Sequence, residues 1–241
     1  MSVCGRHGSF FAESNPQDQR YLFVSSRTRK NSESSVALRI MHIVALILYK
    51  WRPEAPLEVH SSLDLNKFSY FQRKAVREFI KFHSRIIVGR TAKGQRQSVS
   101  VEQNVGKCHC YVNANGLAGA VLADSDYPMR VAFTLLSEAM RQFEAKVGNK
   151  WVNVSGDAEL DFPEGQDLLS KFQDPSEADK ITKIEKELDE VKGIVIKSMD
   201  DILKRGEALE SLMQKSEDLS QVSYQFYRTA KKNNQCCQVG S

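Results

Sequence analysis

The sequence predicts an α+β fold, in which a five-stranded antiparallel sheet is sandwiched by helices and followed by one long coiled-coil helix. Two observations predict it. Strand-like and helix-like segments follow the order β-β-α-β-β-β-α-α across residues 41–172, and residues 181–230 carry an unbroken 3-4 ladder of mostly apolar positions. Residues 1–40 are rich in Ser, Arg, Asn and Gln without a sustained period, which is typical of a disordered extension.

Two strands and a long helix open the globular part. Residues 41–49 and 57–61 are strand-like and are separated by a turn with two prolines. Residues 68–90 predict a helix with two apolar stripes. The first stripe is Phe68, Phe71, Ala75, Phe79, Phe82 and Ile86, and the second is Val76, Ile80 and Ile87. One stripe suffices to pack a helix on a sheet, so the other predicts a further apolar contact.

Three more strands and two helices complete this part. Residues 98–102, 108–112 and 117–123 are strand-like, with turns between them. A second long helix begins around Pro128, because proline is tolerated in a first helical turn, and reaches about Val147. A shorter helix is predicted over residues 166–172. Residues 174–177 then resemble a capping sequence that opens the long helix.

Composition excludes several classes of protein. The formal net charge of +4 is not gathered on one basic face, so a nucleic-acid partner is not expected. No stretch approaches the roughly 18 apolar residues that a membrane-spanning helix needs. Five cysteines are an odd number and do not form a disulfide framework, which fits a reducing cytosol.

The residues that could do chemistry do not assemble into a site. In Cys108-His109-Cys110, strand geometry directs the two cysteines to one face and the histidine to the other. No second Cys or His pair completes a tetrahedral zinc site, so the cysteines are predicted to be small core residues. There is no P-loop, no Gly-x-Ser-x-Gly and no convincing triad. The sequence therefore predicts no enzyme, no cofactor and no metal.

The remaining candidates for acid–base work are given structural roles. Asp124 and Asp126 are interpreted as turn and cap residues rather than paired general acids. The other histidines of the globular part are predicted to be surface residues of strands or helices: His42, His60 and His83.

The ladder over residues 181–230 is the strongest pattern in the chain. Its rungs are Ile181, Ile184, Leu188, Val191, Val195, Ser198, Ile202, Arg205, Leu209, Leu212, Ser216, Leu219, Ser223, Phe226 and Ala230. Arg205 splits it into seven rungs on each side. A buried arginine needs acceptors from partner helices. Gly193 and Gly206 each cost roughly 1 kcal/mol relative to alanine, so the segment is expected to become fully helical only on binding partners. A generic coiled coil or homodimer is the alternative.

Short motifs along the chain resemble those of the longin R-SNAREs, most closely the lipid-anchored YKT type. They include Asp126-Tyr127-Pro128-Met129-Arg130 and Lys231-Lys232-Asn233-Asn234-Gln235-Cys236-Cys237. The other matching stretches are residues 68–73, 94–98, 133–136, 187–192, 205–207 and 215–217. The resemblance implies a longin (profilin-like) domain over residues 41–173, an R-SNARE motif over 174–233 and a lipidation tail over 234–241.

The resemblance also implies partners. Three Q-SNARE helices (Qa, Qb and Qc) would complete a parallel four-helix bundle, with Arg205 facing three glutamines in the central layer and the other rungs forming the flanking layers. The implied function is vesicle docking and fusion in ER–Golgi, endosomal or vacuolar traffic. The implied location is the cytosol and the cytoplasmic face of Golgi, ER-derived, endosomal or vacuolar membranes, without a transmembrane helix.

Attachment to the membrane would then depend on the tail. The resemblance implies palmitoylation of Cys236 and prenylation of Cys237, and two lipids are needed for stable anchoring. Arg228, Lys231 and Lys232 would add attraction to anionic headgroups. Four residues follow Cys237, so the standard C-a-a-X box is absent. Either a five-residue variant is recognised, or this C-terminus is an altered form without the prenyl chain. Two free thiols are the remaining alternative.

Because residues 68–90 carry two apolar stripes, the sequence predicts a clasp on this helix. The aromatic members of the first stripe, Phe68, Phe71, Phe79 and Phe82, are expected to hold the chain's own C-terminal segment. The rival interpretation is a longin-type trafficking adaptor or tether, whose coiled coil scaffolds partners without driving fusion. Acyl transfer onto itself is a third interpretation, for which the sequence offers no dedicated catalytic group.

Overall fold

The computed structural model describes residues 42–102, 106–176 and 193–238, with side chains placed up to Thr229 in the last helix. Residues 1–40 and the first four rungs of the ladder therefore lie outside the described residues. The same holds for the side chains of Ala230, Cys236 and Cys237.

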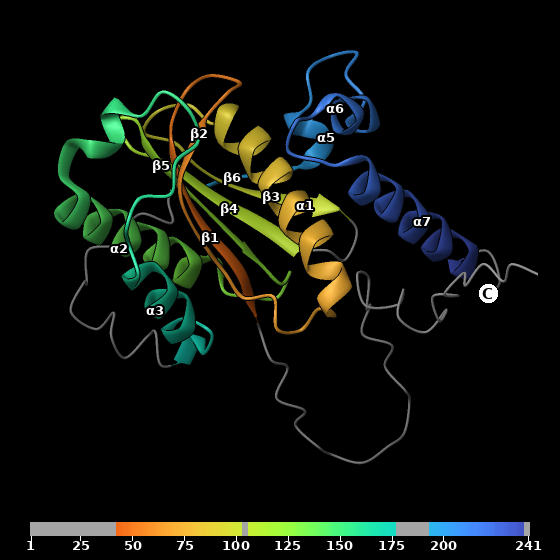
Figure 1. The fold of residues 1–241 in the computed structure, drawn as a ribbon, viewed down its shortest axis with the longest axis horizontal. Coiled ribbons are helices and arrows are strands. Elements are labelled where there is room, and N and C mark those ends of the chain that lie inside the picture. Colours follow the sequence, from red (N-terminus) through yellow and green to blue (C-terminus); the bar gives the residue numbers. More distant parts are fainter. Residues whose placement is uncertain (1–41, 103–105, 177–192, 239–241) are drawn as a thin grey trace, which may run out of the picture.

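A six-stranded sheet in the order β2-β1-β5-β4-β3-β6 forms the centre of the molecule (Figure 1). Its strands are β1 (Ile43–Lys50), β2 (Leu57–Leu63), β3 (Arg96–Glu102), β4 (Gly106–Val112), β5 (Leu117–Ala123) and β6 (Val195–Ser198). The first five pair antiparallel, as predicted. β6 pairs parallel to β3, from Gln97 opposite Val195 to Ser100 opposite Ser198, and was not predicted.

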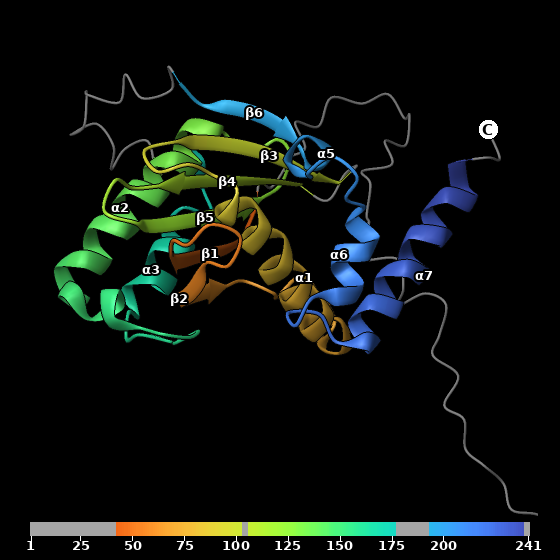
Figure 2. The same ribbon diagram turned by 90° about the horizontal axis from the view of Figure 1, so that it is seen from above.

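Helices cover both faces of the sheet. On one face lies α1 (Tyr70–Gly89), with α5 (Met199–Ile202) beside it against β3 and with α6 (Leu209–Lys215) and α7 (Gln221–Gln238) farther out. On the other face lie α2 (Met129–Val147), the 3-10 helix η2 (Gly148–Asn153) and α3 (Glu164–Lys171). Figure 2 shows α6 and α7 outside α1, so the C-terminal segment adds a layer to this side of the fold. The predicted α+β class is confirmed.

Side-chain alternation along the strands separates two apolar cores. Cys108 and Cys110 are buried in the core beneath α1, as predicted. His109 points to the opposite face, where its ring meets Phe133 of α2 edge-on with 5.6 Å between ring centroids. Gly119 allows α2 to approach the sheet, because a Cβ atom there would lie 2.8 Å from Leu136 Cδ2.

The structure differs from the predicted long helix between residues 193 and 220. Gly193 and Gly206 adopt positive φ angles of 128° and 85°, which interrupt helical geometry. Ser198 starts a new helix, because its hydroxyl accepts a hydrogen bond from the Asp201 amide. Without partner helices, the segment buries its apolar residues against its own globular domain instead.

The prediction that His42, His60 and His83 are surface residues is wrong, since all three are buried. His83 lies between Phe79 and Phe82, with ring centroids at 3.9 and 4.9 Å. His60 is a residue of β2, and residues 160–162 cover its ring, with the ring centroid 5.2 Å from that of Phe162. Alternating patterns place a residue on a face, but they do not show whether another segment covers that face.

Acidification is expected to destabilise this fold. Burial lowers the pKa of His83 to about 4 despite a hydrogen bond to the Phe79 carbonyl, and burial together with nearby Lys107 lowers the pKa of His109 to about 4. The unfolded chain binds these protons below pH ~6.5, whereas the folded chain does not. The stability that these neutral histidines contribute is therefore fully present above pH ~6.5. It declines as the pH falls toward ~4, by on the order of 3 kcal/mol per histidine.

Urea unfolding at a series of pH values measures this decline. The ring nitrogens of His109 have no hydrogen-bond partner among the described residues, so His109→Leu removes a titrating group without breaking a bond. The variant should lose about half of the dependence between these pH values. An unchanged pH slope would contradict the assignment.

Candidate functional site

The first apolar stripe, to which Phe79 and Phe82 belong, contacts the C-terminal segment. Ser69 and Gln72 form a capping box that starts the helix. Val76 and Ile80 face the sheet, whereas Phe79 faces α7, with its ring centroid 5.6 Å from that of Tyr227. The two stripes of α1 therefore serve different contacts.

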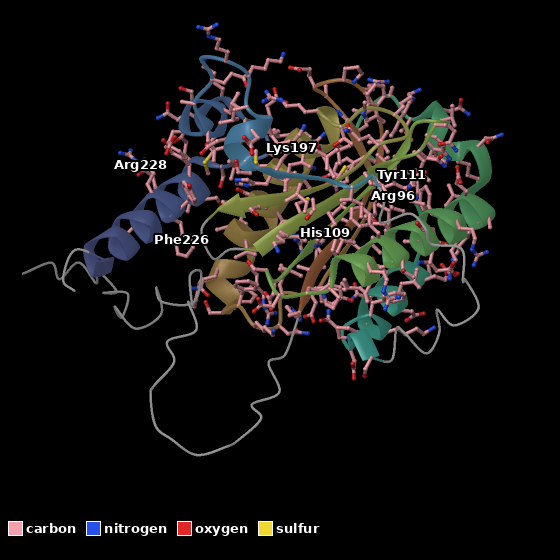
Figure 3. The ribbon with its side chains drawn as sticks, turned by 180° about the vertical axis from the view of Figure 1, so that it is seen from behind. Arg96, His109, Tyr111, Lys197, Phe226 and Arg228 are labelled. Atoms are coloured by element: carbon pink, nitrogen blue, oxygen red, sulfur yellow. The ribbon has the colours of Figure 1, made fainter. Side chains whose placement is uncertain are left out.

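A small apolar cavity lies where α1 and α7 meet. Its volume is about 70 Å³. It is lined by Val44, Phe68, Ala75, Val76, Phe79, Ile80, Leu122, Ser223, Phe226 and Tyr227. In Figure 3, Phe226 and Arg228 lie on different sides of α7, in agreement with a half-buried Phe226 and an exposed Arg228. α7 is thus amphipathic, with its apolar side on the cavity.

Helices α5 and α6 extend the apolar contact. Ile202, Leu209 and Met213 are buried in the same cluster as Phe82, whose side chain is 2% exposed. Phe71 is the exception among the predicted clasp residues, because it is 90% exposed and lies outside the contact. The stripe that the sequence indicates is therefore longer than the surface that the C-terminal segment covers.

Charged groups hold the loop between α6 and α7 against α1. Arg85 Nε lies 2.7 Å from Asp218 Oδ2, and Lys81 Nζ lies 3.8 Å from the other oxygen of this carboxylate. The Ser220 amide donates to Glu78 Oε2 at 2.8 Å. Burial alone would raise the pKa of Glu78, but hydrogen bonds from Ser220 and Ser223 hold it below its usual value.

Asp157 binds the same two cations from the other side. Its Oδ2 atom lies 2.6 Å from Arg85 Nη2 and 2.9 Å from Lys81 Nζ. Burial would lower the pKa of Arg85, but its hydrogen bond to Asp157 and the charge of Asp218 raise it. Each cation therefore has an acidic partner in the globular domain as well as one in the C-terminal segment.

A second set of polar contacts lies near the end of α1. Arg90 Nη1 donates to the Ile202 carbonyl at 2.9 Å and lies 2.8 Å from Glu207 Oε2. Lys204 Nζ lies 2.8 Å from Glu54 Oε1 in the β1–β2 loop. Together with the β3–β6 pairing, these contacts fasten residues 195–207 to the domain.

The ladder residues share one property in this structure. The described apolar and serine rungs are buried or half-buried: Val195, Ser198, Ile202, Leu209, Leu212, Ser216, Leu219, Ser223 and Phe226. Arg205 is the exception and lies exposed in the turn before Gly206. Sequence reasoning missed Met199, Met213, Tyr224 and Tyr227, which are also buried although they stand off the ladder.

The structure also contains a triad-like arrangement of Ser62, His60 and Glu159 that the sequence did not indicate. His60 Nε2 lies 2.9 Å from Ser62 Oγ, and His60 Nδ1 lies 2.7 Å from Glu159 Oε1. Ser62 is only 3% exposed, and a Cβ atom on Gly165 would lie 2.7 Å from its hydroxyl oxygen. A nucleophile needs access to substrate, so this group is interpreted as structural.

Comparisons with known proteins match both parts of the chain. The Longin family model, described as a regulated-SNARE-like domain, matches residues 65–164, and the synaptobrevin model matches residues 180–238. VAMP-like protein YKT61 of Arabidopsis thaliana is 44% identical over 201 residues, covering 83% of this chain and 100% of the relative. Synaptobrevin homolog ykt6 of Schizosaccharomyces pombe is 40% identical over 198 residues, covering 82% and 98%. None of the described helices is long and apolar enough to cross a membrane.

Proposed function

Because the chain belongs to the YKT-type longin R-SNAREs, we propose that it pairs with three Q-SNARE helices, Qa, Qb and Qc, to drive vesicle docking and fusion. It is a trafficking protein of a SNARE family rather than an enzyme. In the bundle, the ladder residues form the layers and Arg205 faces three glutamines. Formation of the bundle supplies the work of bringing two membranes together.

The observation that carries this proposal is the double use of the ladder. Leu209 and Leu219 are buried against the globular domain here, yet their spacing also suits a four-helix seam. The same side chains cannot occupy both places. We therefore propose that this arrangement is a closed state, in which the longin domain inhibits assembly by holding its own SNARE segment.

Opening this state leaves the longin domain intact. When Asp218 leaves, Arg85 and Lys81 keep their contacts with Asp157. Asp157 therefore keeps both half-buried cations paired with an acidic side chain after Asp218 has left. The electrostatic contacts thus favour the closed state without making release prohibitive.

Membrane attachment completes the proposal. Palmitate on Cys236 and a prenyl group on Cys237 would hold the protein on the cytoplasmic face of Golgi, ER-derived, endosomal or vacuolar membranes, in exchange with the cytosol. The intact mass of the protein from its own cells measures which of the two lipids is present. A mass without either lipid would contradict the anchoring step.

Arg205 separates the two states experimentally. Arg205→Leu should leave the closed state within about 0.5 kcal/mol of wild type, because the side chain is exposed. In the bundle it would leave three buried glutamines without their donor, which weakens assembly by roughly tenfold or more. Circular dichroism and native gels with soluble Q-SNARE helices measure assembly, and urea unfolding measures the closed state.

Lys215→Ala is the matched control, since Lys215 is exposed and stands off the ladder. It should change neither measurement. The proposed function fails if the wild-type segment forms a stable homodimer alone and gains no helicity with any Q-SNARE set.

A further inference from the structure

The first turn of α1 exposes two neighbouring aromatic rings. Tyr70 is 80% exposed and Phe71 is 90% exposed, and their rings meet edge-on at 5.7 Å. Within residues 42–102, 106–176 and 193–229, the other exposed large apolar side chains are Val152, Ile196 and Val222, which are scattered singly. Exposing two adjacent aromatic rings to water is unfavourable, so this exposed pair indicates a contact surface.

Among the residues that the structure describes, the C-terminal segment does not contact this pair. Phe71 shares a sequence stripe with Phe79, but the C-terminal segment covers α1 only from about Ala75 onward. The sheet does not cover the pair either, because Gln72 and Val76 are the first buried residues of the helix. Tyr70 and Phe71 therefore have no role in either apolar core.

Positive charge surrounds the pair. Lys67, Arg73, Lys74 and Arg77 are all exposed. The one acidic residue in the first half of α1 is Glu78, whose carboxylate already accepts a hydrogen bond from Ser220 and lies 3.9 Å from Lys74. Aromatic rings among lysines and arginines match the interface of an anionic bilayer, where rings insert at headgroup level and cations meet phosphates.

α7 begins beside α1 and runs away from it. In Figure 1 the start of α1 and the end of α7 both lie on the right, but Figure 2 shows that the end of α7 points away from the start of α1. α7 also exposes Arg228.

We infer that the first turn of α1 is a second membrane contact, in which Tyr70 and Phe71 insert among the headgroups of an anionic phospholipid bilayer and the four surrounding cations bind its phosphates. The inference rests on the proposed function only in that the protein works at membranes. It requires neither the lipidated cysteines nor bundle assembly.

Vesicle binding by the full-length chain without lipid on its cysteines tests the inference. The chain should sediment with phosphatidylcholine vesicles that contain phosphatidylserine, and much less with phosphatidylcholine alone. Added salt should weaken this binding. The double variant Tyr70→Ser/Phe71→Ser should reduce the partition coefficient about tenfold. Lys74→Glu should reduce it further, because each cation near an anionic surface contributes roughly fivefold.

Ile196→Ser is the matched control, since Ile196 is 70% exposed but lies on β6. It should bind vesicles as wild type does. Equal binding by wild type and the double variant overturns the inference, and so does equal binding to both kinds of vesicle. If the double variant instead loses bundle assembly in solution, the pair serves a protein contact. If the wild-type chain binds vesicles as expected but its SNARE segment gains no helicity with any Q-SNARE set, only the proposed function is overturned.

Discussion

Phe82→Glu is expected to release residues 199–229 from α1 while the sheet and α2 stay folded. Phe82 is 2% exposed within the cluster that includes Leu209 and Met213, so a carboxylate there would be buried without a partner. That burial costs several kcal/mol. The chain avoids the cost when the C-terminal segment leaves, because Phe82 lies on the stripe away from the sheet.

Hydrogen exchange measures the release directly. Amides of α5, α6 and the start of α7 should lose protection by roughly two orders of magnitude or more, whereas those of β1, β4 and β5 should keep theirs. Assembly with Q-SNARE helices should become faster, since the closed state no longer competes. Unchanged protection of residues 199–229 would sink the closed-state interpretation.

Two variants on the same helix make this result specific. Phe71→Glu lies on the same sequence stripe, but Phe71 is 90% exposed, so exchange in the C-terminal segment should stay as in wild type. Ile80→Glu places the same charge on the sheet side and should unfold the whole domain. If Phe82→Glu also unfolds the domain, Phe82 belongs to the core of the domain and not to the contact.

The sequence could predict the five antiparallel strands and both long helices because each has a clear period. It could not predict β6. Val195 and Ser198 stand on the ladder, and the heptad pattern outweighs a four-residue strand whose pairing depends on backbone hydrogen bonds with β3. The pattern predicts how the segment would meet the proposed partner helices, whereas the structure shows how it folds without them.

The apolar stripe of the candidate site was visible in the sequence, but its extent and polar contacts were not. Nothing local distinguishes Phe71 from Phe79, although one is exposed and the other faces Tyr227. The pairing of Arg85 with Asp218, and of His60 with Glu159, joins segments far apart in the chain. A single sequence carries no signal for such pairs. The clasp was therefore predictable as a surface but not as a set of contacts.

Leu209→Asp is expected to damage both states of the SNARE segment. Leu209 is 9% exposed in the closed state and stands on the rung that follows Arg205 in the ladder. An unpaired aspartate on either apolar surface costs about 3–5 kcal/mol. The variant should lose protection in α6, as Phe82→Glu does, yet bundle assembly should weaken by about a hundredfold or more. Hydrogen exchange and Q-SNARE titration distinguish the two effects.

Ser211→Asp adds the same charge two residues away, where the side chain is exposed and off the ladder, and should leave both measurements near wild type. The three variants should then separate the two proposed uses of one segment. Phe82→Glu should open the closed state and speed assembly, and Arg205→Leu should weaken assembly without opening. Leu209→Asp should open the closed state and prevent assembly. Normal assembly by Leu209→Asp would show that the ladder is not the surface that meets the Q-SNAREs, because no four-helix seam buries an unpaired carboxylate without a large loss of affinity.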